Sequence, residues 1–319
     1  MSINKYKNSN IQVDRVLALN AYNEKYNERT NIDEIRVTQN GIDIDFENID
    51  KNLCEIVLMS QNIIVMAKEG NDLVFQIYRP TKSIENNCYN TVPINLLDII
   101  SINGAEMEVT KHGGKYTERE HKYFPPKDNI LKKEEFFLSV KKEGIIKKSN
   151  TLIHIPRIFH FKIITIVNQP INSEYIDFSG CEIKSILEMY FRNVNRQINI
   201  DYNIISAKED LLKQELEEAL DQEYDVIFTI GGTGVGPGDI TFDVVNNMCD
   251  KVLPGIMEFI RVKYGQNNSH ALLSRSIAGI IKNTVIYTIP GSKKAVIEYM
   301  QVILDTMEHL IYVMNGLSH

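Results

Sequence analysis

The sequence predicts a mixed two-domain protein, with a mostly-β barrel followed by an α/β domain that has a parallel sheet and helices on both faces. Up to about Ile146, short apolar stretches alternate with polar turns, which is typical of a barrel. From Phe159 onward, apolar strands alternate with helical patterns, which is typical of a parallel sheet. Because 319 residues suit two domains, we expect these over residues 1–150 and 155–319.

The first half contains short strands separated by turn signals. Residues 105–110 alternate between apolar and polar side chains, which is the period of a strand with one buried face. The pairs Asn40-Gly41 and Asn103-Gly104 are typical of hairpin turns, and residues 139–146 are interpreted as a last hairpin. The predicted strands span residues 15–21, 34–37, 63–66, 73–78, 99–102 and 105–110.

The second half begins after a lysine-rich polar stretch, residues 147–151, which is the predicted linker. Phe159–Val167 is an apolar run that suits a buried parallel strand. Residues 181–193 and 208–220 have apolar side chains at helical spacing, so we expect those side chains to face the core. Further strands are expected at residues 198–205, 226–230 and 284–289, and a last helix at residues 293–314.

The composition narrows the class of partner and the compartment. A net charge of −7 and a pI near 5.6 disfavour nucleic acid or an anionic membrane as the main partner, since both require a basic surface. The first residues lack the apolar stretch of a signal peptide. Four scattered cysteines without a CxxC pair do not predict a zinc site. We therefore expect a cytoplasmic protein.

The strongest functional signal is a glycine-rich loop after the predicted strand at residues 226–230. Glycines are dense between Gly231 and Gly238, and they let a ligand approach the backbone N–H groups. Those groups and the following helix N-terminus favour an anion. Thr241 is placed to cap that helix, and Asp239 is placed to hold Mg²⁺ against phosphate oxygens. A tight structural turn is the alternative. The loop is neither a Walker loop nor a GxGxxG motif.

The loop resembles a known signature. Thr229-Ile-Gly231-Gly232-Thr233-Gly234, followed by Asp239-Ile-Thr241, is similar to the T-x-G-G-T-G…D-x-T motif of molybdopterin-binding domains. Further blocks that resemble this family, in the same order, are residues 174–180, 253–255, 273–275, 278–280 and 289–296. Together they cover nearly the whole second half.

The resemblance implies a role in molybdenum cofactor biosynthesis. The activity it implies is Mg²⁺-dependent transfer of AMP from ATP to the terminal phosphate of molybdopterin, in a homo-oligomer that is a trimer in the family. It implies that Asp239 is the catalytic residue and the metal ligand. The residues implied to bind phosphate, pterin or nucleotide are Gly231, Gly232, Thr233, Gly234, Ser179, Gly180, Ser274, Arg275, Pro290, Gly291 and Ser292.

Two positions depart from the family pattern. The family often has Ser-Asp after its first strand, where this chain has Val167-Asn168. Adenylylating members usually have an acidic residue after the third strand, where this chain has Ala207. A carrier or regulator that binds molybdopterin without turnover is therefore the alternative function, and a scaffold that has lost its ligand is a third. Asp177 and Glu209 are candidates to replace the missing carboxylate.

The first half resembles a MOSC domain. The similar segments are residues 15–20, 40–45, 96–104, 107–110 and 132–144. A MOSC domain uses a cysteine after its L-E-V-T strand as sulfur carrier, whereas residues 111–119 here contain no cysteine. Cys54 and Cys88 lie elsewhere, where buried structural roles are expected. Because a nucleophilic thiolate cannot be replaced by the residues present, we expect a degenerate MOSC-like barrel without sulfur transfer.

Overall fold

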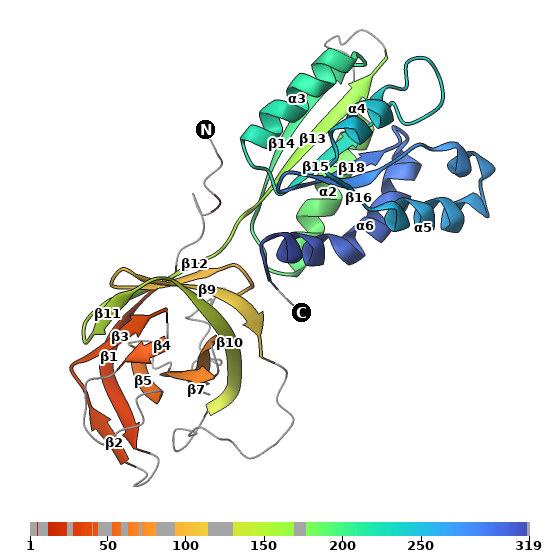
Figure 1. The fold of residues 1–319 in the computed structure, drawn as a ribbon. Coiled ribbons are helices and arrows are strands. Elements are labelled where there is room, and N and C mark those ends of the chain that lie inside the picture. The colour runs from red at the N-terminus through yellow and green to blue at the C-terminus, as the bar shows by residue number, and fades with distance from the viewer. Residues whose placement is uncertain are drawn as a thin grey trace. The chain divides into compact units, whose positions relative to one another are not determined.

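The computed structural model divides the chain into two compact units (Figure 1). One unit spans Asn8–Arg157, and the other combines Ile158–His319 with Met1–Lys7. The structure describes residues 5, 12–23, 28–39, 41–43, 53–58, 63–69, 72–80, 93–113, 130–168 and 177–317. Asn40, Cys88 and residues 114–119 and 174–176, which entered the predictions, lie outside this part. No helix in the described part is long and apolar enough to span a membrane.

The first unit is built from antiparallel strands. These are β1 Gln12–Asn23, β2 Glu28–Asn31, β3 Glu34–Thr38, β4 Gly41–Asp43, β5 Leu53–Leu58, β6 Ile63–Glu69, β7 Asp72–Pro80, β8 Ile99–Ile102, β9 Ala105–His112, β10 Ile130–Lys142, β11 Gly144–Lys147 and β12 Thr151–Ile155. One sheet has the order β12-β8-β9-β10-β7-β6-β5-β1-β2, and β12 also pairs with β1, which closes the sheet on itself. A smaller sheet has the order β11-β3-β4. The prediction of a mostly-β first half is confirmed.

Two of the hairpins predicted for this unit are present, whereas the hairpin predicted at residues 139–146 and the predicted linker are not. β3 pairs with β4 and β8 pairs with β9, and the second turn has positive φ at Asn103 and Gly104, as a primed hairpin turn requires. The hairpin predicted at residues 139–146 is wrong, because β11 pairs with β3 whereas β10 pairs with β7 and β9. At Gly144 a Cβ would lie 2.6 Å from the backbone nitrogen of Ala105, so the chain packs directly against the start of β9 before β11 pairs with β3.

The predicted linker at residues 147–151 is also wrong, because these residues form a turn between β11 and β12. The Asn150 side chain accepts a 2.6 Å hydrogen bond from the Lys147 N–H. The Ser149 N–H donates to the carbonyl of Val16, and the Asn150 carbonyl accepts from the Val16 N–H. These hydrogen bonds tie the turn to β1, and the unit continues through β12 to Arg157.

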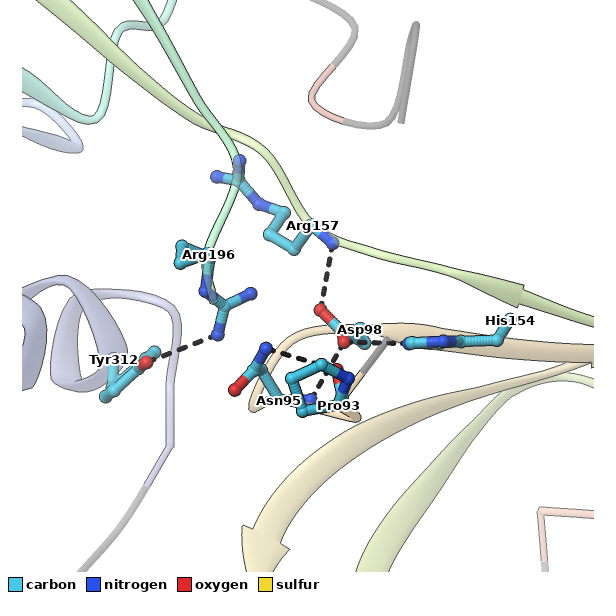
Figure 2. Close-up of polar contacts among 7 residues, drawn as sticks. All are labelled: Pro93, Asn95, Asp98, His154, Arg157, Arg196 and Tyr312. Carbon is cyan, nitrogen blue, oxygen red and sulfur yellow. Dashed lines mark hydrogen bonds and ion pairs between the residues drawn. The ribbon is translucent and has the colours of Figure 1, made fainter. Parts of the chain in front are cut away.

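A buried carboxylate fixes the end of this unit. Asp98 has no exposed surface, and its carboxylate accepts hydrogen bonds from the backbone N–H groups of Asn95 (2.8 Å) and Arg157 (2.9 Å). His154 Nε2 lies 2.9 Å from the same carboxylate. Figure 2 shows these groups around Asp98. Asp98 therefore fastens the chain where the unit ends, and His154 contributes to this structural contact.

The second unit contains a six-stranded sheet of order β14-β13-β15-β18-β17-β16. Its strands are β13 Phe159–Val167, β14 Ile198–Ser206, β15 Val226–Ile230, β16 Lys251–Val252, β17 Ala278–Ile281 and β18 Thr284–Ile289. β14, β13, β15 and β18 are parallel, as predicted. The prediction is wrong for β17 and β16, since β17 runs antiparallel to both of its neighbours. Only Lys282 and Asn283 separate β17 from β18, and so short a connection can join antiparallel strands only.

Helices cover both faces of this sheet, as predicted (Figure 1). They are α2 Phe178–Asn193, α3 Glu209–Asp221, α4 Thr241–Met248, α5 Pro254–Gly265 and α6 Lys293–Met314, with a short 3₁₀ helix at Ser269–Leu273. Leu212 and Leu216 of α3 and Val245 of α4 pack with Ile164 and Ile227 on one face. On the other face Phe191 of α2 contacts Phe159 and Phe161, and α6 packs against α2 and α5.

Lys5 belongs to the second unit, although it precedes the first unit in the chain. Its carbonyl accepts a 2.9 Å hydrogen bond from the Ile158 N–H. Its ammonium group lies 3.1 Å from the carboxylate of Asp225, which is buried at the start of β15. The other oxygen of Asp225 accepts a hydrogen bond from the His160 N–H. Lys5 therefore neutralises a carboxylate that bridges two central strands.

Candidate functional site

The glycine-rich loop begins where the fully buried strand β15 ends. Gly231 and Gly232 both have positive φ, +97° and +63°, and a Cβ on Gly231 would lie 2.6 Å from the Ile166 carbonyl oxygen. Only glycine therefore fits at Gly231 without strain. The Gly231 N–H donates to the carbonyl of Ile289 on β18. These contacts fix the loop at the carboxyl edge of the sheet, where open α/β sheets bind ligands.

Thr241 closes the base of the loop, which differs from the predicted role as helix cap. It is the first residue of α4, and the cap position is Ile240, which makes no side-chain cap hydrogen bond. The Thr241 hydroxyl donates instead to the Gly231 carbonyl at 2.7 Å, and the Thr241 N–H donates to the Gly232 carbonyl at 3.0 Å. The Thr241 hydroxyl therefore stabilises the loop and does not cap α4.

Three successive amides in this loop have no acceptor in the part of the chain that the structure describes. They are the N–H groups of Gly232, Thr233 and Gly234, for which no hydrogen bond to a described residue is found. Gly232 and Gly234 are partly exposed, and Thr233 is buried. Consecutive amides of this kind at the end of a strand bind anions such as phosphate. We refer to residues 232–234 as the amide cup.

Asp239 folds back onto the same loop. Its carboxylate accepts a 2.8 Å hydrogen bond from the Gly236 N–H, and its own N–H donates to the Gly236 carbonyl at 3.0 Å. A Cβ on Gly234 would lie 2.6 Å from Asp239 Oδ2, so the carboxylate lies beside the amide cup. Among the described residues no group of three or more His, Cys, Asp or Glu is placed to hold a metal. Asp239 can hold Mg²⁺ only together with ligand oxygens or water, which Mg²⁺ accepts readily.

The two departures from the family pattern lie near this loop. Ala207 is partly buried, packs against the apolar cluster under α3, and donates its N–H to the Val167 carbonyl. A Cβ on Gly238 would lie 3.2 Å from Asn168 Oδ1, so the Asn168 amide lies beside the loop. Glu209 is exposed at the first position of α3. A neutral amide and an apolar methyl group therefore occupy positions where a second carboxylate was expected.

Asp177 does not supply the missing carboxylate, because its oxygens are already engaged. It is the N-cap of α2 and accepts hydrogen bonds from the N–H groups of Ser179 and Gly180, each at 3.0 Å. Its second oxygen accepts from the hydroxyls of Thr165, at 2.5 Å, and Tyr202. Burial raises the pKa of Tyr202, and the hydrogen bond to Asp177 raises it further. Asp177 is thus a structural carboxylate.

The other predicted glycines and serines meet at the same edge of the sheet. The Ser179 hydroxyl donates to the Gly291 carbonyl at 2.8 Å, and a Cβ on Gly291 would lie 3.5 Å from the Gly231 Cα. Ser292, which follows Pro290-Gly291, caps α6 through a 3.3 Å hydrogen bond from the Ala295 N–H. A Cβ on Gly180 would collide with Asp177 and Tyr202. The N-terminus of α2 and the loop between β18 and α6 therefore flank the glycine-rich loop.

Of the predicted pair Ser274 and Arg275, only Arg275 is hydrogen-bonded to this loop in the described part of the chain. The Ser274 hydroxyl is bonded to the hydroxyls of Ser276 (2.8 Å) and Tyr299 (3.1 Å), so it faces α6. The Arg275 N–H donates to the Thr233 carbonyl at 2.8 Å, which brings Arg275 to the amide cup.

The Arg275 guanidinium pairs with Asp243, which the sequence did not suggest. Hydrogen bonds from Arg275 lower the pKa of Asp243, and the hydrogen bond to Asp243, with the charges of Asp243 and Asp239, raises the pKa of Arg275. Asp239 and Arg275 both contact the amide cup, Asp239 beside Gly234 and Arg275 at the Thr233 carbonyl. An acidic residue in the first turn of a helix is common for helix-dipole reasons, so nothing in the sequence singled out Asp243.

Comparison with known proteins bears on this half of the chain. A family described as "Probable molybdopterin binding domain" matches residues 163–309. Molybdenum cofactor biosynthesis protein B of Staphylococcus aureus (strain Mu50) is 33% identical over 114 residues, which are 35% of this chain and 68% of that protein. The chain belongs to the molybdopterin-binding domain family. The resemblance predicted for the second half is confirmed, and the family match leaves residues 1–162 outside it.

Other proteins are similar to this chain over comparable lengths. Molybdopterin adenylyltransferase of Helicobacter pylori (strain J99) is 28% identical over 158 residues, which are 49% of this chain and 88% of that protein. Molybdenum cofactor synthesis protein cinnamon of Drosophila melanogaster is 31% identical over 156 residues, and the chain spans only 25% of its length. A solved structure of a molybdenum cofactor biosynthesis protein B covers 50% of this chain and 98% of its own, with 28% identity and a TM-score of 0.45.

Proposed function

We propose that this protein binds molybdopterin at the amide cup and transfers AMP from ATP to its terminal phosphate, as a step of molybdenum cofactor biosynthesis. The observation that carries the proposal is the set of three successive amides without a described acceptor at the carboxyl end of β15. The molybdopterin adenylyltransferase of Helicobacter pylori, which matches half of the chain, supports it.

In the proposed reaction a phosphate oxygen of molybdopterin attacks the α-phosphorus of ATP. A new O–P bond forms, the bond between the α-phosphorus and its bridging oxygen breaks, and pyrophosphate leaves with the electron pair. Catalysis of such a transfer is mainly positioning and charge neutralisation. The amide cup holds the terminal phosphate of molybdopterin next to the phosphates of ATP, as the transfer requires, and Arg275 adds positive charge beside both. Asp239 would hold Mg²⁺, which supplies charge neutralisation on the nucleotide phosphates.

The second candidate is a carrier or regulator that binds molybdopterin without transfer. Ala207 and Asn168 favour it, because they put no carboxylate where the family pattern has one, and no group of three or more His, Cys, Asp or Glu among the described residues is placed to hold a metal. A single carboxylate is a weak metal site unless the nucleotide phosphates complete it. The two candidates share the amide cup and differ in whether AMP is transferred.

The test is turnover by the full chain with molybdopterin, ATP and Mg²⁺. We expect adenylylated molybdopterin and pyrophosphate to form. Asp239→Asn should slow the transfer by about 100-fold or more, as loss of a key electrostatic group does, while molybdopterin binding persists. The matched control is Asp221→Asn, which removes a carboxylate that is 76% exposed at the far end of α3 and should leave the rate unchanged.

The outcomes separate the candidates. Tight molybdopterin binding without AMP transfer would leave the carrier or regulator. Calorimetry that detects neither molybdopterin nor ATP would overturn both and favour a scaffold that has lost its ligand.

For the rest of the molecule we propose what the sequence suggested. The first unit is a degenerate MOSC-like barrel without sulfur transfer, and the predicted domains 1–150 and 155–319 are adjusted to Asn8–Arg157 and to Ile158–His319 with Met1–Lys7. The protein acts in the cytoplasm as a homo-oligomer, a trimer by family resemblance. Alkylation and mass spectrometry during a sulfur-transfer assay would test the first point, because persulfide on any cysteine of residues 1–150 contradicts it.

A further inference from the structure

The guanidinium group of Arg275 is held by two consecutive residues of α4. Its two terminal nitrogens donate to the two carboxylate oxygens of Asp243, at 2.9 and 2.5 Å. Its central carbon lies 4.3 Å from the ring centroid of Phe242. Its backbone N–H is bonded to the carbonyl of Thr233 in the amide cup. Asp243 therefore fixes one edge of the guanidinium group and Phe242 covers one of its faces. The backbone of Arg275 is bonded to the loop.

Stability does not account for this arrangement. The side chains of Arg275 and Asp243 are 34% and 54% exposed, and ion pairs this open to solvent contribute little to stability. What a bidentate pair does provide is a fixed plane, because two parallel hydrogen bonds and a stacked ring remove rotation.

The fixed plane leaves donors for a ligand. A guanidinium has five N–H groups, and two of them point at Asp243. No described residue accepts from the others. These remaining N–H groups belong to Arg275, whose backbone is hydrogen-bonded to the amide cup. The Asp239 carboxylate lies beside the same cup. A terminal phosphate or diphosphate is the ligand chemistry that such a preoriented guanidinium recognises.

We propose that Asp243 and Phe242 are positioning residues, which hold the guanidinium plane of Arg275 so that its open N–H groups complete the phosphate site of the amide cup. This rests on the proposed function, since it concerns the phosphates bound there. Asp243 acts through Arg275 and touches no ligand itself. Removing the Asp243 carboxylate therefore weakens phosphate binding only when residue 275 is an arginine, whose N–H donors lie in one plane.

The test is a double-mutant cycle on ATP affinity, measured by calorimetry with the full chain and Mg²⁺. We expect Asp243→Asn and Arg275→Lys each to weaken ATP binding by about tenfold, the size of one charge-assisted hydrogen bond. The double variant should bind no worse than Arg275→Lys alone, because coupled residues are not additive. Phe242→Leu, a second variant that keeps α4 intact, should weaken binding less. Asp221→Asn, which removes an exposed ion pair with Lys282, is the control and should bind ATP normally.

A second measurement separates this inference from the proposed function. In protein labelled with ¹⁵N-arginine, rotation of the Arg275 guanidinium should be slow in the wild type and fast in Asp243→Asn. Fast rotation in the wild type, additive losses, or tighter ATP binding by Asp243→Asn would each overturn the positioning role. Slow rotation together with no ATP or molybdopterin binding by the wild type would instead overturn the proposed function and leave the Asp243–Arg275 clamp without a phosphate to orient.

Discussion

Asp177 and Asp239 are two aspartates at the same edge of one sheet, and they differ in how many of their hydrogen bonds are already made. Asp177 is buried and accepts from two backbone N–H groups and two hydroxyls. Asp239 is half-buried and accepts one described hydrogen bond, from its own loop. A carboxylate with saturated oxygens holds the fold, whereas one with an open oxygen remains available to a metal or ligand. The same substitution should therefore destabilise the fold much more at Asp177 than at Asp239.

The largest effect is expected for Asp177→Ala. It removes a helix cap and leaves the buried hydroxyl of Thr165 and the partly buried hydroxyl of Tyr202 without their acceptor, so we expect a loss of about 3–5 kcal/mol in the free energy of unfolding. Asp239→Ala should cost about 1 kcal/mol, since it removes one hydrogen bond. Urea unfolding of both variants measures the difference. Equal losses would show that saturation does not distinguish the two carboxylates.

The middle effect is expected within the glycine-rich loop, for Gly231→Ala. The positive φ of Gly231 and the nearby Ile166 carbonyl predict a loss of about 1–3 kcal/mol from backbone strain, together with weaker phosphate binding. Gly238→Ala is the control, because its Cβ would meet only the movable Asn168 side chain. Thermal unfolding and calorimetry with ATP would measure both. Tolerance of alanine at Gly231 would mean that the loop is less tightly fixed than its contacts imply.

The smallest effect is expected at a cap that resembles Asp177 but is exposed. Ser292 accepts one hydrogen bond at the start of α6, so Ser292→Ala should cost about 1 kcal/mol and Ser292→Gly a few tenths. Urea unfolding of the two variants provides the comparison. A loss as large as that of Asp177→Ala would indicate that Ser292 supports more than the helix end.

Elements with strong apolar patterns were predictable from sequence. The structure has β13, β15, β18 and α6 at the predicted residues, because each is a buried run or a long amphipathic helix that local patterning determines. The start of α2 was placed three residues late at Cys181. An N-cap reading of Asp177 before Phe178-Ser179 could have located it.

What the sequence could not reveal depends on partners distant in the chain. Arg275 and Asp243 are 32 residues apart, and neither helical nor strand spacing relates them. The Thr241 hydroxyl had a local use as a cap, and it is the Gly231 carbonyl that takes it instead. The glycine-rich loop itself was predictable, because its density of glycines alone indicates backbone conformations with positive φ. Its hydrogen-bonded neighbours were not.

The position of Lys5 shows how the two units are connected along the chain. Since Lys5 neutralises Asp225 and binds Ile158, the first unit is topologically an insertion near the N-terminus of the second. During synthesis, Lys5 is made 220 residues before Asp225, so its charge is matched only after the whole first unit has been made. Excising the insertion would therefore mean joining Lys7 to Ile158, because a chain that simply starts at Ile158 would lose the cation that covers Asp225.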